Sequence, residues 1–128
     1  MTRTDRGAAA VEMALVTPLL LLMLFGIIDF GRMLNAQITL TEAAREGARA
    51  VSLGHPAEPQ VTAGTGDMGT VAVQATECPG DDTDADAIVE VSHAFQPVTP
   101  LGPLMSWFGG GEDGYVTITA RGVMPCLG

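Results

Sequence analysis

The first part of the chain carries a long apolar run that contains a single charged residue, Glu12. This run extends over residues 8–28. As a helix, its 21 residues would extend about 31 Å, which is the thickness of a bilayer's hydrocarbon core. The pattern therefore predicts a membrane-spanning helix. A carboxylate inside such a helix costs about 2.5–3.5 kcal/mol on insertion scales, so Glu12 is expected to have a partner or a purpose.

The helical period continues beyond the apolar run. Over residues 29–53, apolar side chains gather on one side of a helical projection and charged ones on the other. Gly54, followed by His55-Pro56, is a strong stop signal. We therefore expect one helix over residues 8–53, with a first half in lipid and a second half that projects outward.

Small residues are frequent in the projecting half, and two interpretations of them remain open. Small side chains allow another backbone to approach closely, either a helix of an assembly partner or the chain's own distal domain. The residues concerned are Ala36, Ala43, Ala44, Gly47, Ala48 and Ala50.

The period changes from 3.6 to 2 after Pro56. Alternating patterns predict strands at residues 70–76, 88–95 and 115–122. A Pro/Gly-rich loop, 97–114, separates the last two and contains Trp107-Phe108, which is interpreted equally well as an exposed contact or a buried pair. The fold class is therefore α+β: a long helix whose outer part packs on a small antiparallel sheet.

The charge of the chain excludes one class of partner and indicates a topology. The net charge is −9 and no lysine is present, which is unlike a nucleic-acid-binding surface. Arg3 and Arg6 precede the apolar run and favour a cytoplasmic N-terminus with the remainder exported. A cleaved signal peptide fits less well, because the run is long and the segment 29–32 after it is a poor cleavage site.

Cys78 and Cys126 form the only cysteine pair in the chain. In an exported domain, a disulfide between them would restrict the unfolded chain. The alternative is two unpaired, partly buried thiols. Two thiols without a nearby histidine supply too few ligands for a metal site.

Two local patterns resemble ligand sites. Residues 64–69 match G-x-G-x-x-G, but a strand is expected after the pattern instead of before it, so we interpret it as a flexible loop. Asp82, Asp84 and Asp86 alternate as calcium ligands do, although Ala87 and His93 stand where a calcium loop has glycine and glutamate. A solvated acidic turn is the preferred interpretation, with weak calcium binding as the alternative.

Nothing in the sequence indicates catalysis. The histidines and serines occur outside the known nucleophile contexts, and no acid–base pair stands out. We therefore expect no enzymatic activity and no cofactor.

A short basic leader, a glycine and a glutamate five residues further on resemble the start of type IV pilin precursors. Several short sequence segments within residues 6–54 more specifically resemble the TadE-like family of minor pseudopilins. These segments are Arg6-Gly7-Ala8-Ala9-Ala10-Val11-Glu12, Pro18-Leu19-Leu20-Leu21-Leu22, Phe25-Gly26-Ile27-Ile28-Asp29-Phe30-Gly31-Arg32 and Ala43-Ala44-Arg45-Glu46-Gly47-Ala48-Arg49-Ala50. The resemblance implies cleavage by a prepilin peptidase between Gly7 and Ala8, and it implies that Glu12 is the assembly glutamate.

The resemblance predicts a minor pseudopilin-like structural component for assembly or initiation of a Tad/Flp pilus. The expected organisation is a leader (1–7), a transmembrane and projecting helix (8–54) and a small extracytoplasmic β-rich domain (55–128). Expected partners are other pilins, the pilus assembly platform and the prepilin peptidase, at the bacterial inner membrane. The alternative is an uncleaved, single-pass binding module that displays the loop around Trp107.

Overall fold

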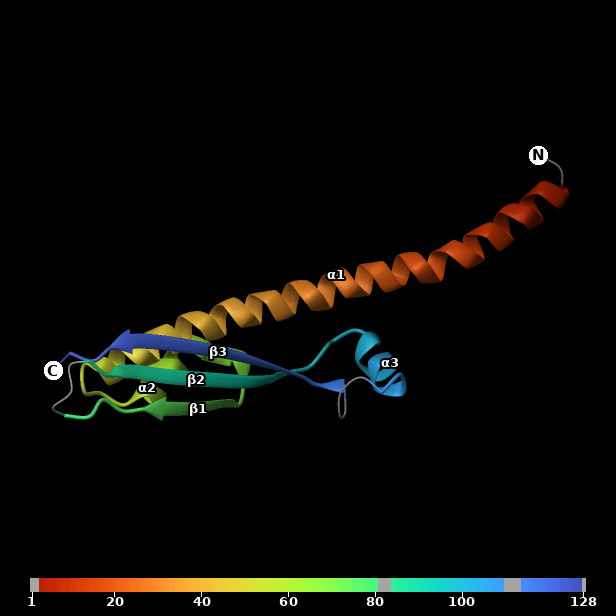
Figure 1. Cartoon of the computed structure of the whole chain (residues 1–128). Helices are drawn as coiled ribbons and strands as arrows, with labels where there is room; N and C mark the ends of the chain where they lie inside the picture. Colours follow the sequence, from red (N-terminus) through yellow and green to blue (C-terminus); the bar gives the residue numbers. More distant parts are fainter. Residues whose placement is uncertain (1–2, 81–83, 110–113, 128) are drawn as a thin grey trace. The chain divides into compact units, whose positions relative to one another are not determined.

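The computed structural model describes residues 3–80, 84–109 and 114–127, and it has the predicted α+β fold (Figure 1). In chain order, the elements are α1 (Arg3–Ser52), α2 (Ala57–Thr65), a 3-10 helix η1 (Gly66–Met68), β1 (Val71–Thr76), β2 (Asp86–Phe95), α3 (Leu101–Trp107) and β3 (Val116–Pro125).

Helix α1 is longer at its start than the sequence predicted. It runs without a break through Pro18 for 50 residues. It begins at Arg3 instead of Ala8, and Asp5 in its first turn stabilises this start because an acid interacts favourably with the positive end of the helix dipole. The predicted stop is confirmed: Gly54 has a φ of 79°, and the His55 amide donates to the Ala50 carbonyl at 2.9 Å.

The three predicted strands form one antiparallel sheet with the order β1-β2-β3. In its register, Val91 of β2 lies opposite Val73 of β1 and Ala120 of β3. Strands β2 and β3 extend two or three residues beyond the predicted ends, to Asp86 and Pro125, which are paired with each other. The central strand β2 is therefore hydrogen-bonded on both sides.

The core lies between the sheet and the two helices α1 and α2. It is built mainly from small and β-branched side chains, with Leu40 and Phe95 as its largest members. Along β2, His93 falls in the same alternating set of positions as Val89, Val91 and Phe95, which are buried. The structure leaves His93 half-buried, with Nδ1 3.0 Å from the Thr70 carbonyl oxygen. The core residues are Leu40, Ala43, Ala44, Ala48, Val51, Ala57, Val61, Ala87, Val89, Val91, Phe95, Ile118, Ala120 and Cys126.

Close approach explains the small residues in the second half of α1. A Cβ added to Gly122 of β3 would lie 2.2 Å from the Ala44 carbonyl oxygen. A Cβ added to Gly47 would lie 2.8 Å from a methyl of Val61 in α2 and 3.3 Å from a methyl of Val89 in β2. In the structure, these small residues therefore pack against the chain's own sheet and α2, which is one of the two interpretations left open by the sequence.

Two helices lie where the sequence predicted loops. The segment 64–69 was expected to be a flexible loop, but Gly64 and Thr65 end α2 and η1 follows. A Cβ on Gly64 would lie 3.1 Å from the Ala43 Cβ, so this first glycine of the pattern serves close helix packing. The expected loop 97–114 contains α3, whose seven residues are too few to produce a recognisable helical period.

The contacts divide the chain into two compact units that differ from the expected segments. The first unit, which we call the span unit, is Met1–Arg32 with Pro97–Gly114. The second, the sheet unit, is Met33–Gln96 with Tyr115–Gly128. Helix α1 contributes to both units, and the segment between β2 and β3 associates with its first half.

Candidate functional site

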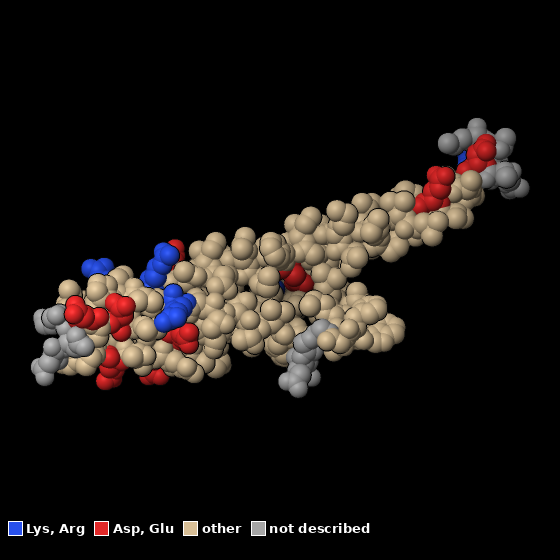
Figure 2. Space-filling view, viewed as in Figure 1, with Lys and Arg blue, Asp and Glu red and all other residues tan. Residues whose placement is uncertain are grey.

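The first half of α1 exposes its apolar side chains. In the candidate membrane span, none of the most apolar window is buried inside the protein. Figure 2 shows a long uncharged stretch on this part of α1, whereas acids and arginines gather on the sheet unit. Leucines at 44–72% exposure on a continuous helix would be costly in water, and a bilayer removes that cost.

Glu12 lies on this exposed apolar surface. Its side chain is exposed, and no described side chain forms an ion pair or a hydrogen bond with it. The neighbouring polar side chain is satisfied locally, since the Thr17 hydroxyl donates to the Met13 carbonyl at 2.6 Å. Glu12 is therefore a carboxylate on the apolar surface without a partner among the described side chains.

Gly7 and Ala8 lie in the first turns of α1, and both are exposed. Nothing lies within 4 Å of a Cβ added to Gly7, so this glycine is not required for packing. Glu12 follows Ala8 by four residues, which places the two about 6 Å apart along the helix axis. An amine created at Ala8 would therefore lie one turn from the carboxylate.

The other end of the apolar run carries a buried acid, Asp29, whose role the sequence did not reveal. Asp29 is 7% exposed. Its carboxylate accepts a hydrogen bond from the Val98 amide at 3.1 Å and another from the Thr99 hydroxyl. Arg32 Nη1 lies 3.8 Å from the same carboxylate. The partners are 69 and 70 residues away, so the only sequence signal is an acid placed directly at the end of an apolar run.

The segment after Thr99 leads to two exposed aromatic side chains. Trp107 is 85% exposed and Phe108 is 81% exposed. Their rings stack with centroids 6.1 Å apart. The structure thus resolves the alternative left open above: this pair is a surface feature of the span unit.

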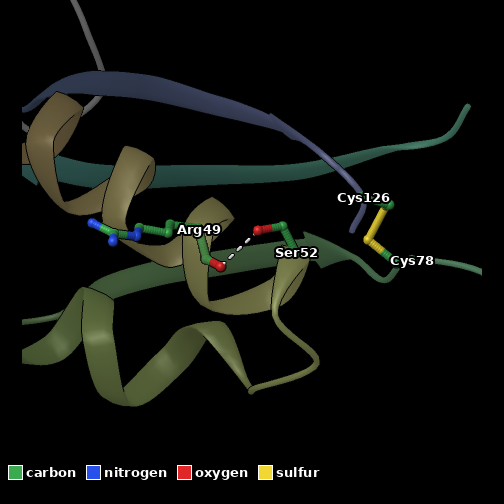
Figure 3. The surroundings of a disulfide bond; sticks show 4 residues. All are labelled: Arg49, Ser52, Cys78 and Cys126. Atoms are coloured by element: carbon green, nitrogen blue, oxygen red, sulfur yellow. Dashed lines mark hydrogen bonds between the residues drawn. A yellow bond between two sulfur atoms is a disulfide. The ribbon is translucent and has the colours of Figure 1, made fainter. Parts of the chain in front are cut away.

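A disulfide joins Cys78 and Cys126 in the sheet unit (Figure 3). It links the residues just after β1 and β3, the two strands that flank β2, with a Cα–Cα distance of 5.8 Å. The Cys126 amide donates to the Ala85 carbonyl at 2.9 Å. Beside it, α1 ends with the Ser52 hydroxyl donating to the Arg49 carbonyl at 2.8 Å.

An open hollow of about 630 Å³ lies beside this disulfide, at the end of α1. Among the described residues that line it, the ionisable side chains are those of His55, Glu58 and Glu77. It is lined by residues 51–58, Val73, Ala75, residues 77–80, Cys126 and Leu127. These residues include no nucleophile paired with a base.

The calcium candidates are only partly described. Asp82 lies outside the described residues, Asp84 is exposed, and Asp86 begins β2. Among residues 3–80, 84–109 and 114–127, no group of three or more His, Cys, Asp or Glu side chains could hold a metal ion.

The exposed apolar half of α1 and the small sheet unit define a single-pass, membrane-anchored α+β protein. The model of the family described as TadE-like protein matches residues 7–49. The TadE-like resemblance drawn from the sequence is therefore confirmed over these residues, and this family implies a component associated with the Tad pilus. The matched region ends within α1. No curated protein and no solved structure is found to match the chain.

Proposed function

We propose that the protein is a minor pseudopilin-like, non-enzymatic subunit that helps initiate or assemble a Tad/Flp pilus. The observation that carries the proposal is Glu12, which is exposed on an apolar helix and pairs with no described side chain, within a region matched by the TadE-like model. An isolated carboxylate at that depth is unfavourable, so a cation from a neighbouring subunit is the expected partner.

A prepilin peptidase would supply that cation by cutting between Gly7 and Ala8. In an array of parallel helices, the new Ala8 ammonium of one subunit pairs with Glu12 of the next. The pairing neutralises both charges in lipid and fixes the axial offset between subunits. Because Gly7 and Ala8 are helical in the uncut chain, the peptidase must unwind the first turns of α1 before it cuts.

The proposed topology has a cytoplasmic N-terminus and an extracytoplasmic sheet unit at the inner membrane. Arg3 and Arg6 support this orientation through the positive-inside rule. The Cys78–Cys126 disulfide supports it independently, because such bonds persist in oxidising compartments.

The first prediction concerns cleavage and the role of Glu12. We expect mass spectrometry of the native protein to show a chain that starts at Ala8. We expect Glu12→Ala to insert in the membrane at a normal level and to abolish piliation. Glu46→Ala, which removes an exposed acid of the sheet unit, is the matched control and should leave piliation normal.

Two results would contradict the proposal. One is an intact Met1 in cells that carry working pili, and the other is normal piliation with Glu12→Ala. The alternative function, an uncleaved binding module, is suggested by the exposed pair Trp107 and Phe108. It predicts both of those results and requires that loss of this pair abolish ligand binding.

A further inference from the structure

The segment Pro97–Gly109 is an uncharged, partly apolar part of the span unit. It contains no Asp, Glu, Lys or Arg. Its exposed apolar side chains are Val98 at 65%, Met105 at 44%, and the pair Trp107 and Phe108 described above. The protein has a net charge of −9, and its surface outside the apolar run is rich in acids. An uncharged segment with exposed apolar side chains differs from that surface.

Asp29 fixes this segment to the place where the apolar run ends. Its carboxylate accepts hydrogen bonds from Val98 and Thr99, and charge-assisted bonds of this type are strong. The Thr99 hydroxyl oxygen in turn accepts a hydrogen bond from the Leu101 amide at 3.4 Å, at the first residue of α3. A continuous chain of hydrogen bonds therefore runs from α1 to α3.

Burial along α1 agrees with this attachment. Residues 5–24 are exposed, whereas Phe25 and Gly26 are half-buried and Asp29 is buried. Within the span unit, this burial begins in the helical turn that precedes the Asp29 attachment. The segment is therefore held beside the last turn of the apolar run, at the level where a membrane-spanning helix leaves the hydrocarbon.

The backbone of the segment is also suited to a poorly hydrated environment. Pro97, Pro100 and Pro103 have no amide hydrogen. The amides of other residues are satisfied within the unit. The Val98 amide donates to the Asp29 carboxylate and the Leu101 amide to the Thr99 hydroxyl, as described above. Four further amides donate to backbone carbonyls: Gly102 to Thr99, Leu104 to Pro100, Phe108 to Leu104 and Gly109 to Ser106. Few backbone donors therefore still need water, as a location near lipid requires.

We infer that Pro97–Gly109 is an interfacial membrane anchor. Trp107 and Phe108 enter the boundary between headgroups and acyl chains of the leaflet at which α1 leaves the bilayer, and Asp29 is the positioning residue that holds the anchor there. Tryptophan is enriched at this boundary because its ring is apolar and its N–H is polar. The inference depends on membrane insertion of α1, and it does not depend on cleavage at Gly7 or on assembly through Glu12.

Lipid is the occupant that the observations favour over a second copy of the chain. The exposed pair belongs to the same unit as the apolar run, so the surface offered to lipid by α1 continues into the segment. The segment carries no charge that would pair with the acidic surface of another copy. Uncharged aromatic side chains suit a zwitterionic interface without a dedicated protein partner.

The chain provides its own probe, since Trp107 is its only tryptophan. We would reconstitute the full-length protein in phosphatidylcholine vesicles and measure tryptophan emission, quenching by aqueous iodide and quenching by lipids brominated on the acyl chain. The expected result is blue-shifted emission, several-fold weaker iodide quenching than for free tryptophan, and strong quenching by lipids brominated near the headgroup. The double variant Trp107→Phe with Leu127→Trp moves the probe to an exposed residue of the sheet unit and should reverse all three signals.

Variants test the role assigned to Asp29. Asp29→Ala should release the segment and lower bromolipid quenching of Trp107, while α1 remains inserted as judged by carbonate extraction. Asp29→Asn retains an acceptor oxygen and should give an intermediate value. Phe108→Ser should weaken bromolipid quenching without removing the hydrogen bonds of Asp29.

Three outcomes would overturn the inference. One is wild-type protein with iodide quenching equal to that of free tryptophan and no bromolipid quenching. The second is protection of Trp107 that disappears as the protein is diluted in lipid, which would assign the surface to a second copy. The third is bromolipid quenching that neither Asp29→Ala nor Phe108→Ser changes. This result would show that Asp29 does not hold the segment and that Phe108 does not enter the membrane boundary.

Discussion

The two halves of α1 carry apolar residues of different sizes and meet different surroundings. In the first half, large side chains such as Leu19, Leu20 and Leu21 are exposed. In the second half, Ala43, Ala44 and Ala48 are almost fully buried against the chain's own sheet and α2. Large side chains give a helix the hydrophobicity needed to span lipid, whereas small ones let its backbone approach another element closely. One helix is therefore an anchor at its start and a core element at its end.

The largest expected effect concerns the disulfide, which stabilises the sheet unit alone. Replacing Cys78 and Cys126 by serine removes a cross-link between residues 48 positions apart, which should lower the free energy of unfolding by about 4 kcal/mol in the chain-entropy model. Thermal unfolding followed by circular dichroism in detergent micelles would measure the change. A reductant should lower the midpoint of the wild type and leave that of the serine variant unchanged. Equal midpoints for the two proteins would contradict the prediction.

A matched pair of leucine substitutions tests the two halves of α1 directly. Leu40 is fully buried in the sheet unit, and Leu40→Ala should lower its free energy of unfolding by about 3 kcal/mol. Leu21 is 44% exposed on the apolar run, and Leu21→Ala should change the stability of the sheet unit by less than about 0.5 kcal/mol. Chemical denaturation in micelles measures both. A similar loss for both leucines would show that the halves are not distinct.

The smallest expected change in stability comes from a pair of glycine substitutions, one of which is a control for the other. The Cβ in Gly122→Ala would lie 2.2 Å from the Ala44 carbonyl oxygen, so α1 must move from the sheet at a cost of about 2 kcal/mol. Gly31, by contrast, lies in α1, and nothing lies within 4 Å of a Cβ added to it. Gly31→Ala should therefore be neutral or slightly stabilising, since alanine favours helix. Unfolding midpoints that fall equally in both variants would argue against close packing at Gly122.

The features predicted from sequence are those encoded over short distances along the chain. The apolar run and its length predicted the helix, Gly54 predicted its end, and period-2 alternation predicted the three strands. Helices α2 and α3 were missed because each is short and its residues carry no clear helical period. The segment 64–69 was misinterpreted because Gly64 packs closely against Ala43 of α1, whereas Gly66 and Gly69 have positive φ on either side of the 3-10 turn. The spacing of the glycines shows neither feature.

The residues of the candidate site likewise differ in whether a local sequence pattern indicates them. Gly7, Ala8 and Glu12 could be proposed from their local spacing and lie within the region that the family model matches, and their roles stay predictions. Asp29 was not found, because its partners Val98 and Thr99 are 69 and 70 residues away. No local pattern records which distant segment an acid will hold.

By itself, the sequence determined the membrane-spanning helix, the antiparallel strands and the acid placed within the apolar run, because periodicity and hydropathy act between neighbouring residues. Only the tertiary structure decided which surface covers the small residues of α1, that Asp29 holds the segment after β2, and that Trp107 and Phe108 are exposed. These depend on contacts between distant segments, whose geometry is set by the packing of the whole chain.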